Sequence, residues 1–205
     1  MKILVYYPFP EEKMASLRQL ARMHGDHQLL QVASAEEAVR EAANARGLMG
    51  AFDPVVCAAA PQLEWVQSSS AGMDGLLFPE IVERDVVITN MAGGFASHVA
   101  EHAWGLLLAL SRGIGHAVRR QMRHEWGIPR SVTELTGGTL FIVGLGGVGR
   151  EIARRAAGYD MTILAVDPVL TRKPADIAEL ETPDRDHLHG FLKRADAVVI
   201  ACPRT

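Results

Sequence analysis

One glycine-rich stretch constrains the fold of this chain more than any other part of the sequence. Residues 139–143 are strand-forming or apolar, the triplet Gly144-x-Gly146-x-x-Gly149 follows, and residues 150–153 begin an amphipathic segment. This order predicts a strand, a tight turn and the start of a helix. In such a turn the first glycine allows the bend, the second lets a ligand approach the backbone, and the third lets the helix pack closely on the strand.

The predicted helix start is a suitable place for an anion. Its unpaired N–H groups and partial positive charge favour a pyrophosphate. A second predicted strand, 161–166, ends on Asp167, which lies 18 residues after Gly149. A carboxylate there accepts hydrogen bonds from an adenosine ribose and repels a 2′-phosphate. The combination predicts a dinucleotide site, and the alternative is a glycine-rich turn in another kind of α/β protein.

Strand-like and helix-like segments alternate from the first residues. Before the glycine turn the expected strands are 3–7, 28–32, 47–52, 64–68 and 86–89, and the expected helices are 11–23, a helix capped by Ser34 with Glu37, 54–60 and 97–112. This alternation predicts parallel sheets covered by helices. The glycine-rich segment 90–96 is the expected hinge, so the predicted domains are 1–96 and 97–205.

Composition narrows the class of protein. The chain has 205 residues, of which 48% are hydrophobic and 22% charged, as in ordinary soluble domains. A net charge of −3 favours neither nucleic acid nor an anionic membrane as a partner. The longest apolar run, 103–110, is far shorter than the ~20 residues that span a bilayer. Two cysteines far apart in sequence fit a reducing cytoplasm.

The loop 68–74 is a second candidate binding segment, because ligands gather beyond the carboxyl ends of parallel strands. Its small residues can expose backbone N–H groups to a carboxylate, although an ordinary polar turn is the alternative. A third pattern, formed by His98, Glu101 and His102, matches a zinc-protease motif. It opens a strongly apolar helix without a companion acidic ligand, so we expect a helix start and no metal.

Taken together, the motifs resemble the D-isomer-specific 2-hydroxyacid dehydrogenases, which include glyoxylate/hydroxypyruvate reductases. The matching segments occur in the order of that family and are Leu63–Ser68, Ala71–Asp74, Thr89-Asn90, Val99–His102, Trp126, Glu134–Leu140, the glycine turn, Met161–Pro168, Ala195–Ile200 and Cys202-Pro203. The resemblance runs from about residue 47 to the end. It implies an α/β protein with a flavodoxin-like substrate domain and a partial Rossmann NAD-binding domain, each a parallel sheet with helices on both faces.

The resemblance also assigns roles to particular residues. It implies that backbone N–H groups of Ala71 and Gly72 hold the substrate carboxylate. It implies that Gly147 and Val148 face the pyrophosphate of NAD and that Asp167 faces the ribose. Cys202 and Pro203 would line the adenosine side. Asp167 favours NAD over NADP, and Arg172 nearby leaves NADP open.

The resemblance further implies an enzyme that transfers hydride between NAD(H) and a small 2-oxo or 2-hydroxy acid in the cytoplasm. Family members are usually homodimers through the cofactor domain and its long helix, and the apolar run 103–110 predicts a helix buried on several sides.

The arginine, glutamate and histidine that catalyse the family's reaction follow the point where this chain stops. We therefore expect no catalytic residue here, a longer parent enzyme and an inactive fragment. The alternatives are a non-catalytic NAD-binding module that works by protein contacts, as corepressors related to the family do, or another Rossmann dehydrogenase.

Overall fold

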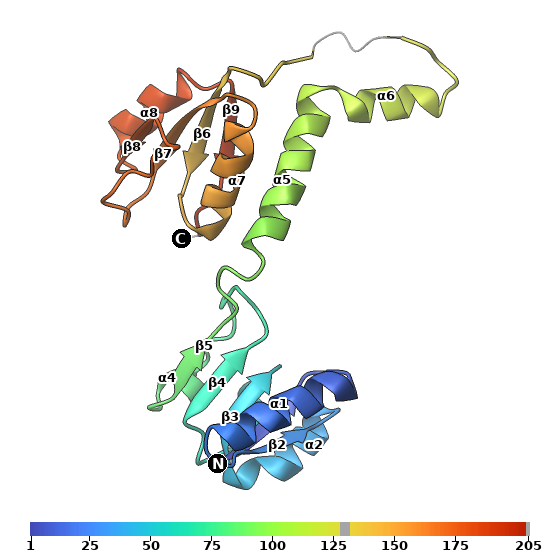
Figure 1. Cartoon of the computed structure of the whole chain (residues 1–205), viewed down its shortest axis with the longest axis vertical. Coiled ribbons are helices and arrows are strands. Elements are labelled where there is room, and N and C mark those ends of the chain that lie inside the picture. Colours follow the sequence, from blue (N-terminus) through green and yellow to red (C-terminus); the bar gives the residue numbers. More distant parts are fainter. Residues whose placement is uncertain (128–131, 204–205) are drawn as a thin grey trace. The chain divides into compact units, whose positions relative to one another are not determined.

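The computed structural model describes residues 1–127 and 132–203. The chain divides into two compact units, one from Met1 to Gly94 and one that begins at Phe95. The division falls inside the glycine-rich segment that the sequence marks as a hinge, two residues before the expected boundary. Each unit contains its own parallel sheet (Figure 1).

The first unit contains a five-stranded sheet in which every described pair of strands is parallel. Its strands are β1 (Lys2–Tyr6), β2 (Gln28–Gln31), β3 (Ala45–Gly50), β4 (Trp65–Ser68) and β5 (Val87–Thr89). Their order is β2-β1-β3-β4-β5. This is the flavodoxin-like order, and the direction of winding reverses between β1 and β3.

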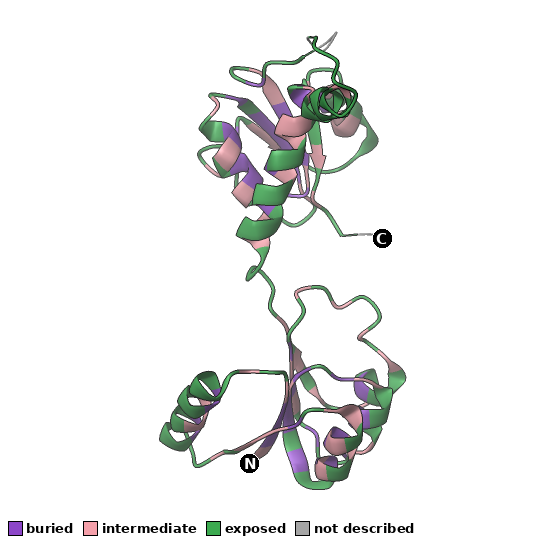
Figure 2. Cartoon of the chain, turned by 90° about the vertical axis from the view of Figure 1, so that its right-hand side faces the viewer, coloured by how far each residue is buried: buried purple, intermediate pink, exposed green. Residues whose placement is uncertain are grey.

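Helices cover both faces of this sheet, which Figure 2 shows nearly edge-on. They are α1 (Glu11–Met23), α2 (Ala35–Glu41), the 3-10 turn η1 (Ala42–Asn44), α3 (Pro54–Ala58) and α4 (Pro79–Val82). The predicted cap of α2 is present, because Ser34 Oγ accepts a hydrogen bond from Glu37 N at 3.2 Å. Glu37 Oε2 in turn accepts one from Ala33 N at 2.7 Å. The first bond satisfies an N–H group that the helix start leaves unpaired, and the second satisfies the N–H of the residue before the cap.

The second unit has a four-stranded parallel sheet in the order β8-β7-β6-β9. Its strands are β6 (Thr139–Val143), β7 (Thr162–Val166), β8 (Glu179–Glu181) and β9 (Ala197–Ile200). Numbered from β6, this is the 3-2-1-4 order of the first part of a Rossmann sheet. The winding reverses between β6 and β9, so the segments after these two strands flank the place where such sheets bind ligands.

Alternating residues of β6 build a core on each face of this sheet. Leu140 and Ile142 pack with Ile152 on one face. Phe141 packs on the other, where its ring lies 5.5 Å from that of Phe191. A strand buried on both faces is apolar at consecutive positions, as residues 140–143 of this strand are. The helices that cover the sheet are α5 (Ala96–Ser111) and α7 (Gly147–Ala157) on the first face and α8 (Arg185–Leu192) on the second; α6 (Ile114–Gln121) follows α5.

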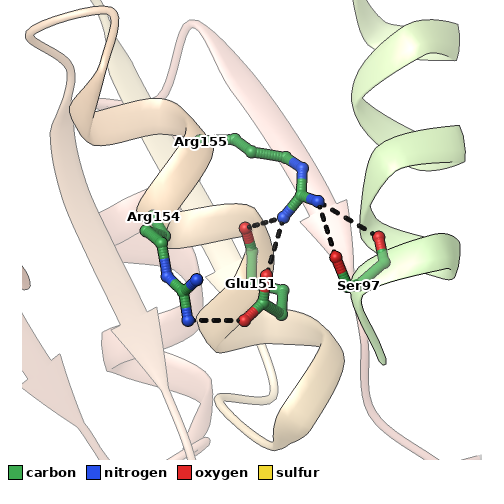
Figure 3. A network of polar contacts seen from close by, with 4 residues as sticks. All are labelled: Ser97, Glu151, Arg154 and Arg155. Atoms are coloured by element: carbon green, nitrogen blue, oxygen red, sulfur yellow. Dashed lines mark hydrogen bonds and ion pairs between the residues drawn. The ribbon is translucent and has the colours of Figure 1, made fainter. Parts of the chain in front are cut away.

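A polar network fastens the start of α5 to α7 (Figure 3). Arg155 Nη2 donates to Ser97 Oγ at 3.1 Å and to the Ser97 carbonyl at 3.2 Å. Its Nη1 donates to Glu151 Oε2 at 2.9 Å and to the Glu151 carbonyl at 2.8 Å. Because one guanidinium joins both helices, the first turn of α5 is fixed to α7 within the second unit.

The long helix α5 is covered on one side within the single chain. Ala100 and Trp104 are buried, but Leu106 and Leu110 on another side are exposed. Burial on several sides, as between domains or at a subunit contact, therefore stays a prediction. No helix in the described ranges is long and apolar enough to cross a membrane.

Candidate functional site

The glycine turn joins β6 to α7 and has the local geometry expected of it. Gly144 has φ +93°, which residues with a Cβ rarely adopt. A Cβ added there would also lie 2.8 Å from the backbone nitrogen of Cys202. Gly144 is therefore required both by its backbone conformation and by the close passage of the segment that follows β9.

The other two glycines serve different purposes. A Cβ on Gly149 would overlap the carbonyl oxygen of Gly144, so glycine is needed for α7 to approach the turn. A Cβ on Gly146 would have no described atom within 4 Å. None of the described residues requires glycine at position 146, and the approach of an outside group would account for it.

The first turn of α7 presents donors to this open space. Gly146 caps the 11-residue helix, and no described acceptor receives the N–H groups of Gly147 and Val148. Such N–H groups lack partners within the helix and must be satisfied by water or a ligand. Together with the helix dipole, they suit a pyrophosphate.

Asp167 follows β7 and contacts the glycine turn directly. Its Oδ2 accepts a hydrogen bond from Leu145 N at 2.8 Å, and its Oδ1 accepts from Val169 N and Leu170 N, each at 2.9 Å. Each carboxylate oxygen can accept about two bonds, so Oδ2 retains capacity for a ribose hydroxyl. Asp167 thus supports the turn as well as being available to a ligand, and the supporting role was not predicted from the sequence.

The ionisation of Asp167 follows from these contacts. Partial burial by itself would raise its pKa, but the hydrogen bonds from Val169, Leu145 and Leu170, with the positive charge of Arg150, outweigh burial and lower the pKa. The carboxylate is therefore charged at neutral pH. A fixed negative charge here disfavours a nucleotide that carries a 2′-phosphate.

Further residues lie around the turn on its helix side and after β9. Arg150 Nε donates to the Leu145 carbonyl at 3.1 Å and so fixes the turn from the helix side. Sequence reasoning missed Arg150, because an arginine in a first helical turn has no distinguishing pattern. Cys202 and Pro203 are exposed and follow β9 beside Gly144, at the edge where the prediction places the adenosine. Arg172 is also exposed.

The first unit contains the second predicted segment, which follows β4. Ser68 is buried and its Oγ accepts from Ser70 N at 3.0 Å. The N–H groups of Ala71 and Gly72 have no acceptor among the described residues. A Cβ on Gly72 would meet no described atom within 4 Å. Two adjacent free donors beside open space form an arrangement that can hold a carboxylate.

Asn90 holds this loop from the other side. Its Nδ2 donates to the Ala71 carbonyl at 2.9 Å, while its Oδ1 accepts from Ala92 N at 3.1 Å. Met91 N donates to the Ser70 carbonyl at 3.0 Å. These bonds occupy carbonyls of the loop and leave the two N–H groups for a ligand.

The histidine pattern at the start of α5 shows no metal-site geometry. His98, Glu101 and His102 are exposed. Across residues 1–127 and 132–203 there is no group of three or more His, Cys, Asp or Glu side chains placed to hold a metal ion.

Comparison with known proteins identifies the second unit. Residues 104–205 match the family model "D-isomer specific 2-hydroxyacid dehydrogenase, NAD binding domain". Over 210 aligned residues the chain is 30% identical to a D-3-phosphoglycerate dehydrogenase of Archaeoglobus fulgidus, with 100% of this chain and 39% of that protein covered. It is 35% identical over 162 residues to a glyoxylate reductase of Thermococcus kodakarensis, with 75% of this chain and 48% of the relative covered.

A solved structure of a protein of the same family is similar to the whole chain. A D-isomer specific 2-hydroxyacid dehydrogenase family protein from Aeromonas salmonicida is similar with a TM-score of 0.80 and 28% identity, covering 100% of this chain and 64% of that one. The chain thus spans about two fifths of the first relative's length and under two thirds of the solved structure. From the Rossmann strand order, the glycine turn with Asp167 and these likenesses, we conclude that the chain belongs to the D-isomer specific 2-hydroxyacid dehydrogenase family and that residues 104–205 correspond to its NAD-binding domain.

Proposed function

We propose that this chain is the substrate- and cofactor-binding part of an NAD(H)-dependent oxidoreductase that interconverts a small 2-oxo acid and the corresponding D-2-hydroxy acid. The observation that carries the proposal is the glycine turn, where the free N–H groups of Gly147 and Val148 lie beside open space and Asp167 is hydrogen-bonded to the turn. The sequence likeness to a glyoxylate reductase and to phosphoglycerate dehydrogenases supports the choice of reaction.

Each unit binds and orients one of the two reactants, the cofactor or the acid. When bound, NAD(H) supplies or accepts the hydride. Gly147 and Val148 hold the pyrophosphate through their N–H groups, and the free capacity of Asp167 Oδ2 holds the adenosine ribose. Ala71 and Gly72 hold the carboxylate of the acid, so that its carbonyl carbon has a fixed orientation. The first unit is then the substrate domain and the second the cofactor domain.

We propose NAD rather than NADP as the physiological cofactor. Asp167 is ionised and already accepts three backbone hydrogen bonds, so it cannot turn away from a 2′-phosphate without leaving those N–H groups unpaired. Repulsion between the two anions then disfavours NADP. Arg172 in the following loop is the residue that could offset this repulsion.

We propose that the acid–base residues of the reaction lie outside the described residues. Strand β9 is at the edge of its sheet, and its apolar side chains Val198 and Ile200 are exposed. An exposed apolar surface of this kind calls for a covering element. The chain alone is then expected to bind NADH and to reduce glyoxylate at no more than a trace rate.

We further propose that the protein is a homodimer through α5 and α6. Exposed apolar side chains recur every fourth residue along this region, namely Leu106, Leu110, Ile114, Val118, Met122 and Trp126. Leu110 is 80% exposed and Trp126 is 99% exposed. Exposed apolar side chains in this number along one segment mark a protein contact, and a second copy of the chain presents the same segment.

A cytoplasmic location completes the proposal. It draws support from the two cysteines, Cys57 and Cys202, which are both free thiols. Free thiols persist where the compartment is reducing.

The central test is binding of NADH to the purified 205-residue chain, followed by fluorescence, with NADPH in parallel. We expect saturable binding of NADH and weaker binding of NADPH. A chain that binds neither nucleotide contradicts the proposal. Assays of glyoxylate and hydroxypyruvate reduction by the parent protein then separate an enzyme from a non-catalytic NAD-binding module, because the module binds NADH without turnover.

A further inference from the structure

A cavity of about 810 Å³ lies at the carboxyl ends of the strands of the first unit. Its lining includes Tyr7 and Phe9 from the loop after β1, Ala33 and Glu37 after β2, Ala51 after β3 and Ser69 after β4. The winding of the sheet reverses between β1 and β3, so this is the position at which α/β sheets place ligands. Its volume is within the ~300–1,000 Å³ typical of small-molecule sites.

The chemical character of the cavity is aromatic and slightly acidic. The rings of Tyr7 and Phe9 lie with their centroids 4.5 Å apart, and Pro8 and Pro10 extend the apolar wall. Glu37 is the lining residue that carries a formal charge at neutral pH. Among the described residues, no lysine, arginine or histidine lines it.

The cavity is formed before any ligand arrives. Gln31 Nε2 donates to the carbonyls of Tyr7 at 2.9 Å and Phe9 at 3.0 Å, and Phe9 N donates to the Tyr7 carbonyl at 2.8 Å. Glu37 is held by its hydrogen bond from Ala33 N at 2.7 Å. Because these bonds fix the loop and the carboxylate, neither can move aside at low cost to admit a group of the wrong charge.

The cavity is continuous with the carboxylate-binding loop. Ser69 belongs to both, and it precedes Ala71 by two residues, a separation of at most about 7 Å along the backbone. A 2-oxo acid whose carboxylate is held by Ala71 and Gly72 can therefore direct its side chain toward the cavity. This step rests on the proposed function, which places the carboxylate on those two N–H groups.

We propose that this cavity receives the substrate side chain and selects 2-oxo acids with an uncharged apolar or aromatic side chain over phosphorylated ones. A phosphoryl group carries about −1.5 to −2 charges and needs cationic partners when it leaves water. Here it would meet aromatic rings and the carboxylate of Glu37. The substrate class therefore differs from the one in the name of the D-3-phosphoglycerate dehydrogenases to which the chain is similar.

The test compares four acids on the ¹⁵N-labelled 205-residue chain by NMR titration: glyoxylate, 4-methyl-2-oxopentanoate, phenylpyruvate and 3-phosphohydroxypyruvate. We expect all that bind to shift the amides of Ala71 and Gly72. Only the acids with apolar side chains should also shift Ala33, Ala51 and Ser69. We expect phenylpyruvate to bind about 10-fold or more tightly than 3-phosphohydroxypyruvate, the factor that ~1.4 kcal/mol represents.

A variant that removes the charge of Glu37 tests whether this carboxylate is the group that disfavours a phosphorylated acid. Glu37→Gln keeps an oxygen that can accept the bond from Ala33 N but removes the charge, and should strengthen binding of 3-phosphohydroxypyruvate about 3- to 10-fold while leaving glyoxylate unchanged. Glu36→Gln on the same helix, at a residue outside the cavity, should change neither affinity.

The outcomes separate the two proposals. If glyoxylate shifts Ala71 and Gly72 but 3-phosphohydroxypyruvate binds as tightly as phenylpyruvate, or if phenylpyruvate leaves Ala33, Ala51 and Ser69 unshifted, the assignment of the cavity is wrong and the proposed function stands. If none of the four acids shifts Ala71 and Gly72, carboxylate binding by that loop fails, and the assignment of the cavity fails with it.

Discussion

The carboxylate of Asp167 accepts a hydrogen bond from the backbone N–H of Leu145 at 2.8 Å. Leu145 lies inside the glycine turn after β6, and Asp167 ends the neighbouring strand β7. One side chain therefore links the segment proposed to hold the pyrophosphate with the segment proposed to hold the ribose. This relationship makes the shape of the turn depend on the ionisation of Asp167.

Asp167→Asn is expected to weaken NADH binding about 10-fold and to reduce the preference for NADH over NADPH. The amide oxygen accepts fewer bonds than the carboxylate, and the charge that repels a 2′-phosphate is lost. Fluorescence titration with both nucleotides measures the two effects. Asp176→Asn, an exposed residue of the following loop, is the control and should leave both affinities unchanged.

The hydrogen bonds to Asp167 should also make the stability of the second unit depend on pH in a characteristic way. Its pKa is lowered in the folded chain, so its contribution to the free energy of unfolding is complete above the unfolded pKa of about 3.9. It is lost as the pH falls through the lower folded value. Hydrogen exchange at Leu145 N–H should accelerate over that acid range, after correction for the intrinsic rate. Asp167→Asn should remove the transition, and an unchanged profile in the variant would contradict the assignment.

Two glycine substitutions in the turn should have separable effects. Gly149→Ala places a methyl group against the Gly144 carbonyl and should lower the free energy of unfolding of the second unit by about 1–3 kcal/mol. Gly146→Ala enters open space, so the melting temperature should be retained while NADH affinity falls. Thermal melts and NADH titration of both variants provide the comparison. Equal loss of stability in the two variants is the result that contradicts the different purposes assigned to these glycines.

Arg155→Ala should loosen α5 from α7 and lower the free energy of unfolding by about 1 kcal/mol, because Ser97 and Glu151 lose their shared donor. The neighbouring Arg154→Ala is a matched control, since that side chain is 76% exposed and contacts only Glu151 among the described residues (Figure 3). Denaturant unfolding followed by the fluorescence of Trp104, which is buried on α5, measures both variants. A loss of equal size in the control would assign the effect to Glu151 rather than to the link between the helices.

Leu110→Glu should convert the proposed dimer to a monomer. A charge at the centre of an apolar contact is not compensated by any partner when two such surfaces meet. Sedimentation equilibrium measures the mass, for which a single chain of 22.3 kDa is the reference. Leu192→Glu, at an exposed apolar residue of α8, is the control and should leave the mass of the dimer unchanged. Wild-type protein that sediments as a monomer at all concentrations contradicts the proposal.

Local sequence patterns were sufficient to predict most of the helices and strands. The helix α1 covers the residues that its apolar spacing predicts, 11–23, and the cap at Ser34 is present. The three-residue strand β8 was missed, because Glu179 and Glu181 flank a single leucine and give no run of strand-forming residues. β8 exists because its backbone pairs with β7, a partner that lies well before it in sequence.

The sequence by itself determined the class of fold and the position of the dinucleotide turn, because strand and helix periodicity and the spacing of glycines act over a few residues. The order of its motifs carried the resemblance to the family. Only the tertiary structure decided that Asp167 supports that turn, that Arg155 fastens α5 to α7, and that an aromatic cavity with one carboxylate borders the loop at Ala71. Each of these depends on side chains brought together by strand order and helix packing, which no local pattern records.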